Sequence, residues 1–456
     1  MRTILLPSER KDFLKKLFTI ALPIGLQNLI SSSLSFLDTL MIGQLGVTQI
    51  AGVGLGNQIF FLASLIFFGA CSGATVFVSQ FYGAQKYKSI QHVMLISFIV
   101  SLCGALVFAV PSVFFPIFLL RLFTTDMAVI EIGRQYLVTV GASYLLSACS
   151  MVISFSLRAT NDAKSPLLIS MASLGTNALL NWLLIFGIGP FPRLEVYGAA
   201  LATVISRALE LVLLIWIARK RKSPASFHLS QAIDGFEKSF LKQYMKTCLP
   251  VMLNEFLWAL GMTAYKMVYS HMGTDVLASV NMTNSIQDLF LVFALGIGNA
   301  SGIMIGNQIG KNQKEAAVRY AKALLFASFA CGLFFGVFMA SFSSLLPRMF
   351  NIPENIYEMT RLTLLFLSPI LIIKSLSITL IVGVLRGGGD TRHALKIEMI
   401  CVWLIGLPAA IISGLVLKLP IYYVVMIVSL DEFCKVLFII PRIISNRWVN
   451  NLTEIG

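Results

Sequence analysis

The chain has 456 residues, of which 57% are hydrophobic and only 12% are charged, and its mean hydropathy is +0.83. Soluble domains carry about 25% charged residues, so this composition excludes an ordinary soluble protein and indicates a membrane protein. The net charge of +14 would suggest a nucleic-acid partner in a soluble protein. Basic cytoplasmic loops of a membrane protein give the same value, so we expect no nucleic-acid partner.

Apolar segments long enough to cross about 30 Å of hydrocarbon follow one another along the chain. The first follows basic residues, as in a signal peptide, but it is too long and lacks a cleavage site, so we expect an uncleaved span. The sequence predicts an all-α membrane protein with twelve transmembrane helices, at residues 17–40, 50–78, 93–120, 132–157, 166–188, 198–218, 247–270, 277–305, 320–346, 361–385, 394–417 and 420–441.

Basic residues of the predicted loops gather on one side of the membrane. Twenty-three fall on the side of the N-terminus, and the opposite side holds four, namely Arg121, Arg193, Arg348 and Lys418. The positive-inside rule therefore predicts that both termini are cytoplasmic. We expect the protein in the plasma (inner) membrane.

The two halves of the sequence repeat. At an offset of 227 in the numbering, Pro23 aligns with Pro250 and Asn57 with Asn284. At an offset of 228, the segment LRATND at 157–162 aligns with LRGGGD at 385–390. Each repeat holds an even number of spans, so the copies are parallel, and parallel repeats are a transporter architecture. We predict an N-lobe at 1–218, a cytoplasmic linker at 219–246 and a C-lobe at 247–456.

The linker allows two interpretations. Leu229, Ile233, Phe236, Phe240 and Tyr244 recur at helical spacing after a basic run at 219–222. This pattern is typical of an amphipathic helix that lies on the membrane interface and tethers two moving lobes. An ordinary solvated connector with anchoring positive charges explains it equally well.

Polar side chains inside the N-terminal spans predict a cation site. An ionisable residue in hydrocarbon costs at least about 2.5–3.5 kcal/mol, which marks Asp38 as functional. The first span also carries Gln27 and Asn28, on the same stripe. Helix rise places Asn181, one turn after Asn177, at about the level of Thr203 on the sixth span. One carboxylate and three neutral oxygen-bearing side chains suit H⁺ or Na⁺; a structural hydrogen-bond cluster is the alternative.

Charged residues inside the C-terminal spans predict a second group. By the same rise, Glu255, Asp288 and Lys374 lie at similar depths on the seventh, eighth and tenth spans. We predict that they form a charged cluster, which either faces the substrate cleft or holds the three helices together. Two other spacings suit internal ion pairs, Arg207 with Glu210, and Asp431 and Glu432 with Lys435.

Cysteines and histidines give no sign of a metalloenzyme. The seven cysteines lie in or beside apolar runs without a CxxC pair, and no histidine–carboxylate group has metal-site spacing. We expect no catalytic residues, no cofactor, and no metal other than Na⁺ at the cation site.

Several motifs together resemble the multidrug and toxic compound extrusion (MATE) family. They are DTLMIGQLG at 38–46, IAGV at 50–53, the paired LRxxxD loops, and the pair Asn177 and Asn181. The resemblance implies two six-helix lobes around a central cleft and alternating access. It also implies export of organic, often cationic and aromatic, compounds driven by H⁺ or Na⁺ entry. We expect a monomer whose partners are a small-molecule substrate and the lipid bilayer.

By resemblance, Asp38, Asn177, Asn181 and Thr203 match the N-lobe cation site of that family. In the C-lobe the chain departs from the pattern. Family members carry an acid about two turns after the proline of the seventh span, whereas Glu255 is five residues past Pro250. The tenth span, acidic in some members, has Lys374 and no acid.

Two other functions remain as alternatives. A flippase for a lipid-linked saccharide or other amphiphile belongs to the same broad superfamily, but such proteins tend to have more spans or a more basic cleft. An intramembrane protease is suggested by the GxGD pattern at 387–390. A loop at a helix end explains those glycines without protease chemistry.

Overall fold

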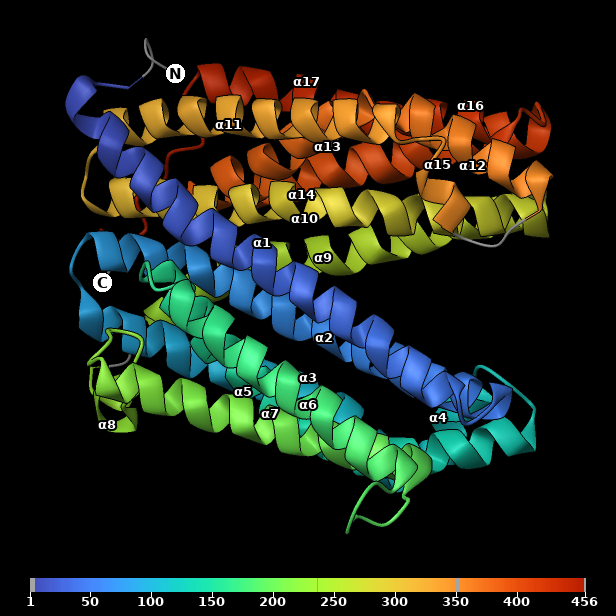
Figure 1. Ribbon diagram of the computed structural model, residues 1–456. Coiled ribbons are helices and arrows are strands. Elements are labelled where there is room, and N and C mark those ends of the chain that lie inside the picture. The colour runs from blue at the N-terminus through green and yellow to red at the C-terminus, as the bar shows by residue number, and fades with distance from the viewer. Residues whose placement is uncertain (1–4, 236, 350–352, 455–456) are drawn as a thin grey trace. The chain divides into compact units, whose positions relative to one another are not determined.

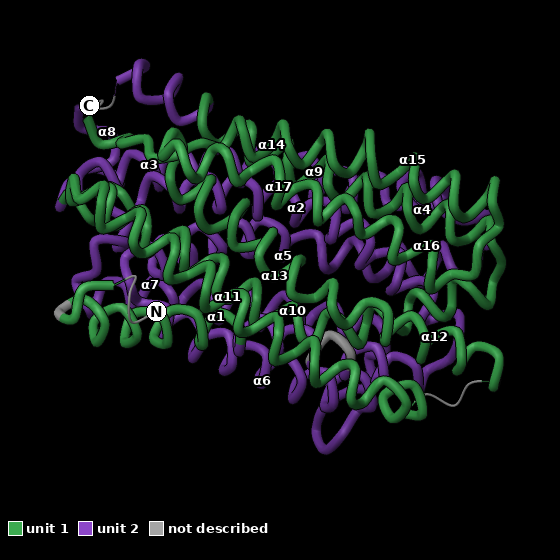
Figure 2. Tube along the Cα trace, turned by 90° about the horizontal axis from the view of Figure 1, so that it is seen from above, with its two compact units in different colours: residues 1–25, 79–84, 246–456 green, residues 26–78, 85–245 purple. Residues whose placement is uncertain are grey.

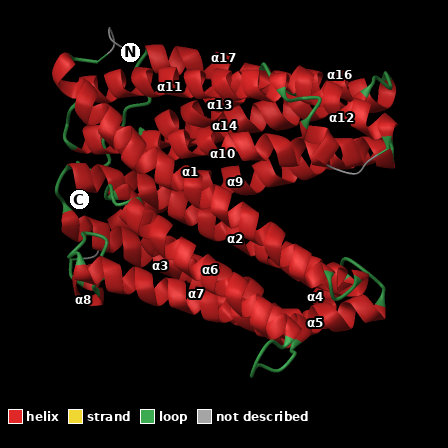
Figure 3. Cartoon of the chain, in the orientation of Figure 1, coloured by secondary structure: helices red, strands yellow, loops and turns green. Residues whose placement is uncertain are grey.

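The computed structural model describes residues 5–235, 237–349 and 353–454, and this part of the chain consists of helices and loops with no strand (Figure 3). Figure 1 labels the helices. Those of the N-terminal half are α1 (Pro7–Gly43), α2 (Val47–Gly83), α3 (Tyr87–Phe114), α4 (Pro116–Arg121), α5 (Met127–Ala159), α6 (Lys164–Phe186), α7 (Glu195–Lys220) and α8 (Leu229–Ile233).

The described part of the C-terminal half also consists of helices and loops. Its α-helices are α9 (Lys238–Met272), α10 (Thr274–Gly310), α11 (Lys314–Ser341), α12 (Glu354–Leu367), α13 (Ile370–Ile378), α14 (Thr391–Met399), α15 (Leu407–Ala410), α16 (Ile421–Val428) and α17 (Leu430–Ile444). Shorter 3-10 and π segments extend or join them: η1 (Leu346–Met349), η2 (Thr379–Arg386), η3 (Ile400–Gly406) and η4 (Ile411–Val416).

The predicted transmembrane helices are present. Among the described residues, nine helices are long and apolar enough to span a membrane, and the bent pair 354–367 and 370–386 makes a tenth. Two less apolar segments complete the twelve. These are α9, whose hydropathy is lowered by polar residues such as Glu255, and the pair α16–α17, whose two helices are only 8 and 15 residues long. The prediction of an all-α, twelve-helix membrane protein is confirmed.

Several predicted spans are interrupted. The tenth bends by 58° between Leu367 and Ile370, because Pro369 removes a backbone donor and restricts the residue before it. The predicted third span, 93–120, ends early at Phe114, and Pro116 starts the separate helix α4. The twelfth is divided at Ser429. Apolar length alone predicted these spans and carried no information on where a span breaks.

Helix packing divides the chain into two compact units, coloured separately in Figure 2. Unit 1 comprises residues 1–25, 79–84 and 246–456, and unit 2 comprises residues 26–78 and 85–245. The start of α1 and the end of α2 therefore group with the C-terminal half. The predicted lobe boundaries at 218 and 247 stay a prediction.

Each unit has its own apolar core. In unit 2 the core lies among α2, α3, α5 and α7 and includes Phe67, Leu137 and Tyr144. In unit 1 one cluster joins α9 to η3 and α16, and another joins α10, α11 and α12. The described ends of the chain both belong to unit 1 and lie at the same end of its helices (Figure 1). This placement agrees with an even number of spans.

The internal repeat is visible in the backbone. Left-handed conformations occur at equivalent positions of the two halves: Gly46 and Gly273 (φ 137° and 133°), Gln85 and Asn312 (59° and 60°), and Asn161 and Gly389 (66° and 81°). Each pair is separated by the offset of the sequence repeat, 227 or 228 in the numbering. Loops that end equivalent helices thus close in the same way.

The linker is not one continuous amphipathic helix. Helix α8 is only five residues long and ends where Asp234 takes an extended backbone conformation, with Gly235 following at φ 70°. Phe236 of the predicted pattern lies outside the described residues. The segment is tied to α3 of unit 2. Gln91 donates to the carbonyls of Pro224 and Ser226 at 3.0 Å each, and Lys88 bonds to Asp234. The connector therefore folds onto its own unit.

Candidate functional site

Asp38 on α1 is a half-buried acid of unit 2. The Asn181 side chain of α6 donates an N–H to the Asp38 carboxylate at 2.7 Å. Asn177, one turn earlier on α6, lies 3.2 and 3.3 Å from the two carboxylate oxygens, with its amide nitrogen turned toward them. That orientation is required because an amide oxygen there would face two acceptors. The structure thus brings together three of the four predicted cation-site residues.

The amide groups give this site two states. Toward an ionised Asp38 they present N–H donors, as in the structure. With the amide oxygen and nitrogen exchanged by a flip of the side chain, they present oxygens, which suits a protonated carboxyl or a bound Na⁺. The Asn181 amide oxygen is buried and has no partner among the described residues. A buried acceptor without a donor is costly, and a flip that turns this oxygen toward a protonated or Na⁺-bound Asp38 would satisfy it.

Thr203 is connected to Asp38 less directly than predicted. Its hydroxyl donates to the Ala199 carbonyl of its own helix, α7, at 3.0 Å. The Tyr136 phenol of α5 interacts with Thr203 and lies within electrostatic range of Asp38. Tyr136 also donates to Asn57 of α2 at 2.9 Å. Asn177 and Asn181 of α6 thus contact the carboxylate directly, and Thr203 and Asn57 are linked to it only through Tyr136.

Gln27, which we assigned to a substrate cleft or charged cluster, is only 8% exposed. It donates to Ser170 and accepts from Arg158, both at 2.6 Å. Ser170 in turn donates to Glu210 at 3.0 Å, and Glu210 pairs with Arg207 at 2.8 Å, as the spacing predicted. These contacts link α1, α5, α6 and α7. The neighbouring Asn28 is half-buried.

The predicted cluster of Glu255, Asp288 and Lys374 does not form as a unit. Glu255 of α9 pairs with Arg386 at the end of η2, at 2.5 Å. Lys374 of α13 donates to Gln287 of α10 at 2.7 Å. Asp288 is exposed, and Lys374 acts on its charge through space. The prediction of three mutual partners was wrong, because helix rise gives a residue's depth but not the direction of its side chain.

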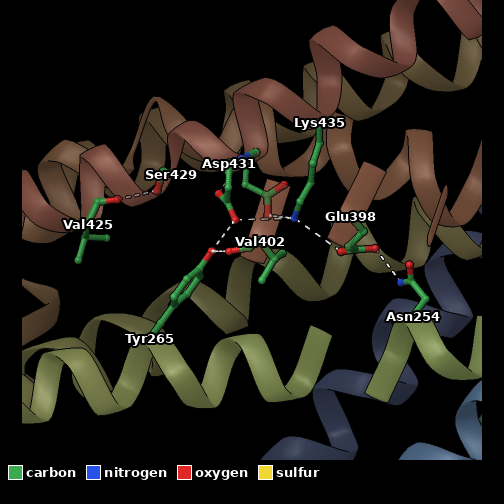
Figure 4. A network of polar contacts seen from close by, with 9 residues as sticks. Asn254, Tyr265, Glu398, Val402, Val425, Ser429, Asp431 and Lys435 are labelled. Carbon is green, nitrogen blue, oxygen red and sulfur yellow. Dashed lines mark hydrogen bonds and ion pairs between the residues drawn. The ribbon is translucent and has the colours of Figure 1, made fainter. Parts of the chain in front are cut away.

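A different charged network is buried in unit 1 (Figure 4). The Lys435 ammonium of α17, 1% exposed, lies 3.0 Å from Glu432, 3.6 Å from Glu398 and 3.9 Å from Asp431. Asn254 of α9 donates to Glu398 at 2.7 Å. Tyr265, also on α9, lies 3.2 Å from Asp431. The predicted ion pairs of Lys435 with Asp431 and Glu432 are present.

Sequence reasoning missed Glu398 and Asn254, although the repeat contained the signal. At offsets of 228 and 227, Glu398 corresponds to Ser170 and Asn254 to Gln27. The Gln27–Ser170 and Asn254–Glu398 hydrogen bonds are therefore equivalent contacts in the two halves. Aligning the two halves shows that the two pairs are equivalent, so the contact in one half indicates the contact in the other.

The glycines at 387–389 have a packing role. A Cβ at Gly387 would collide with the backbone of Gly302 on α10, and one at Gly388 would collide with Trp448. Asp390 pairs with Arg442 at 2.6 Å. These contacts explain the GxGD pattern as a close helix approach and a helix-end loop. Among the described residues, no group of three or more His, Cys, Asp or Glu is arranged to hold a metal ion.

Comparison with known proteins identifies the family. The family model MatE matches residues 23–183 and 250–412, which include both copies of the repeat. The chain belongs to the MATE family. Among proteins similar to this MATE chain, the "Uncharacterized transporter YisQ" of Bacillus subtilis is 26% identical over 435 residues, covering 95% of this chain and 94% of that protein.

Two further comparisons extend the MATE assignment. The "Probable multidrug resistance protein NorM" of Bacillus thuringiensis is 24% identical over 403 residues, covering 88% of this chain and 89% of that protein. The solved structure of the Vibrio cholerae MATE transporter VcmN in the bent form matches with a TM-score of 0.86 at 18% identity, over 97% of this chain and 100% of that one. This MATE protein is thus an integral membrane transporter of the two-lobe, twelve-helix fold.

Proposed function

We propose that the protein is a cation-coupled antiporter that exports organic, cationic or aromatic compounds by alternating access, with H⁺ or Na⁺ as the coupling ion. Its similarity to a protein named as a multidrug resistance protein supports export of such compounds. The single observation that carries the coupling is the geometry at Asp38. Two amides that can turn hold a half-buried carboxylate, and one amide oxygen lacks a partner among the described residues.

The proposed coupling follows from the cost of a bare charge. An ionised Asp38 in low dielectric is stabilised by the two amide donors and by Arg207, which acts on it through space. Binding of H⁺ or Na⁺ neutralises Asp38 and releases the amides. The site then differs in charge between its loaded and empty states. This difference would favour a different packing of α1 against α6 in each state. Thr203 and Tyr136 would complete the oxygen set for Na⁺.

Uptake into everted membrane vesicles tests this proposal, with a fluorescent organic cation as substrate. A pH gradient and a Na⁺ gradient are imposed separately. We expect substrate accumulation with at least one gradient and its collapse when the gradient is dissipated. Accumulation that depends on neither gradient would overturn the coupling. Translocation of a lipid-linked saccharide with no uptake of organic cations would favour the flippase alternative.

A further inference from the structure

The Lys435 network has more carboxylates than its cations can neutralise. Three acids contact one ammonium, and Asp431, Glu398 and Lys435 are 3%, 6% and 1% exposed. If every group were ionised, the network would carry two excess negative charges. Uncompensated charge in a protein interior within a membrane is strongly unfavourable. The network therefore requires at least one additional positive charge.

The surrounding side chains do not supply it. Lys374 of α13 acts on Asp431 and Glu432 from a distance, and it is shared with Gln287 and Asp288. Among the described residues, the other groups that face the acids are uncharged in their ordinary state: Ser377, Tyr265, Tyr269 and Cys401. The ammonium of Lys435 already lies among the carboxylates, where a metal ion would need to be. A proton is the cation that this geometry accommodates.

Tyr265 can form a hydrogen bond with Asp431 in both the ionised and the protonated state of the carboxyl group. Its hydroxyl lies 3.2 Å from the Asp431 carboxylate and 3.2 Å from the Val402 carbonyl (Figure 4). When Asp431 is ionised, Tyr265 donates its hydrogen to the carboxylate. When Asp431 is protonated, the carboxyl O–H donates to the phenol oxygen, and the phenol donates to Val402. Both states are fully hydrogen-bonded.

Asn254 can likewise form a hydrogen bond with Glu398 in either protonation state. Asn254 is 2% exposed, its amide nitrogen binds Glu398 at 2.7 Å, and its amide oxygen has no partner among the described residues. After a flip of the side chain, the amide would present that oxygen to a protonated Glu398. Glu432 differs from both acids, because it makes the closest contact with Lys435, at 3.0 Å. Asp431 and Glu398 are therefore the two acids suited to hold a proton.

The repeat relates this network to the Asp38 site. At an offset of 227, Tyr265 corresponds to Asp38, and at 228, Asp431 corresponds to Thr203. Each half thus has one acid and one hydroxyl at these two positions. The acid lies on the first span of the N-terminal half, at Asp38, and on the last span of the C-terminal half, at Asp431. We propose that the Asp431–Glu398–Lys435 network is a second proton-binding site, in which Asp431 or Glu398 holds an exchangeable proton. This inference does not depend on the role of Asp38.

Infrared spectroscopy of the full-length protein in lipid nanodiscs tests the proposal, because a protonated carboxyl group has its own C=O stretch. Spectra are recorded as the pH is raised from neutral to alkaline. We expect a carboxyl band at neutral pH that disappears on titration and shifts in heavy water. Asp431→Asn and Glu398→Gln should each reduce or shift that band. Tyr265→Phe keeps every charge and should shift its frequency, because one hydrogen bond to Asp431 is lost.

Two controls make the result specific. Glu358→Gln removes a half-exposed acid that pairs with Arg361 on α12 and should leave the band unchanged. Asp38→Asn should leave the part of the band that Asp431→Asn removes, even if it abolishes transport. The proposal would be overturned if the band were unchanged in Asp431→Asn, Glu398→Gln and Tyr265→Phe. It would also be overturned if the wild-type protein had no carboxyl band that titrates.

Discussion

Several buried charged side chains of this protein have partners on other helices. Glu255 and Arg386, 13% and 5% exposed at their side chains, pair at 2.5 Å between α9 and η2. In the N-terminal half, Arg158 contacts Gln27 from the equivalent helix end, since Arg158 and Arg386 are related by the repeat. An arginine at the end of the fourth span thus ties that span to the first in both halves.

Removal of one partner from the Glu255–Arg386 pair should be strongly destabilising. Breaking a buried ion pair costs about 3–5 kcal/mol, because it leaves an unpaired charge. We expect Glu255→Gln to lower the unfolding temperature in detergent, and Glu255→Gln combined with Arg386→Gln to restore part of the loss. Glu358→Gln, which removes the acid of an exposed pair, is the matched control. Strictly additive effects of the two buried substitutions would contradict this account.

Sequence reasoning predicted residue contacts well where short spacing carries the information. The helical turn between Asn177 and Asn181 and the i,i+3 spacing of Arg207 and Glu210 fix which side chains share a face. It failed for Glu255, Asp288 and Lys374, which lie on three helices. Whether side chains on separate helices meet depends on how each helix is rotated, and a single sequence does not show this.

At the scale of elements, the linker and the broken spans were the least predictable parts. Periodicity suggested a helix through 229–244, but α8 ends after five residues, where Asp234 takes an extended backbone and Gly235 a positive φ. The linker is instead fastened by side chains of α3. The hydrogen bond from Lys88 lowers the pKa of Asp234, and His92 adds a smaller electrostatic contribution in the same direction.

The Lys88–Asp234 contact should weaken in acid. Because the folded pKa of Asp234 is lowered, the contribution to stability is complete above the ordinary aspartate pKa and is lost as the pH falls through the folded value. Both groups are exposed, so the effect is local. A spin label attached after Ser230→Cys should become more mobile as the pH falls. Lys88→Met should make the label mobile at neutral pH and remove the pH dependence; unchanged behaviour in this variant would refute the contact.

At the scale of the whole molecule, the even number of spans and the distribution of basic loops predict cytoplasmic termini. In a variant without the seven native cysteines, Ser230→Cys and Asp275→Cys place single thiols at exposed positions on opposite predicted sides. An impermeant thiol reagent added to intact cells should label only position 275. Labelling of position 230 from outside would reverse the proposed topology.

The architecture was the most predictable property. Span length, the even count and the two-fold repeat all follow from hydropathy and internal alignment, which need no knowledge of side-chain packing. The compact units were not predictable in the same way. Residues 1–25 and 79–84 pack with the C-terminal half, and a long helix such as α1 gives no sequence signal where it passes from one unit to the other.

Coupled transport by an Asp38→Asn variant tests the central claim most directly. Purified wild type, Asp38→Asn and Asp12→Asn are reconstituted into proteoliposomes, and export of a fluorescent organic cation is driven by the gradient that serves the wild type. Asp12 lies on the same helix but is exposed and paired with Lys16. We predict that Asp12→Asn retains gradient-driven transport and that Asp38→Asn loses it while remaining folded and membrane-inserted. Full gradient-driven transport by Asp38→Asn would contradict the account.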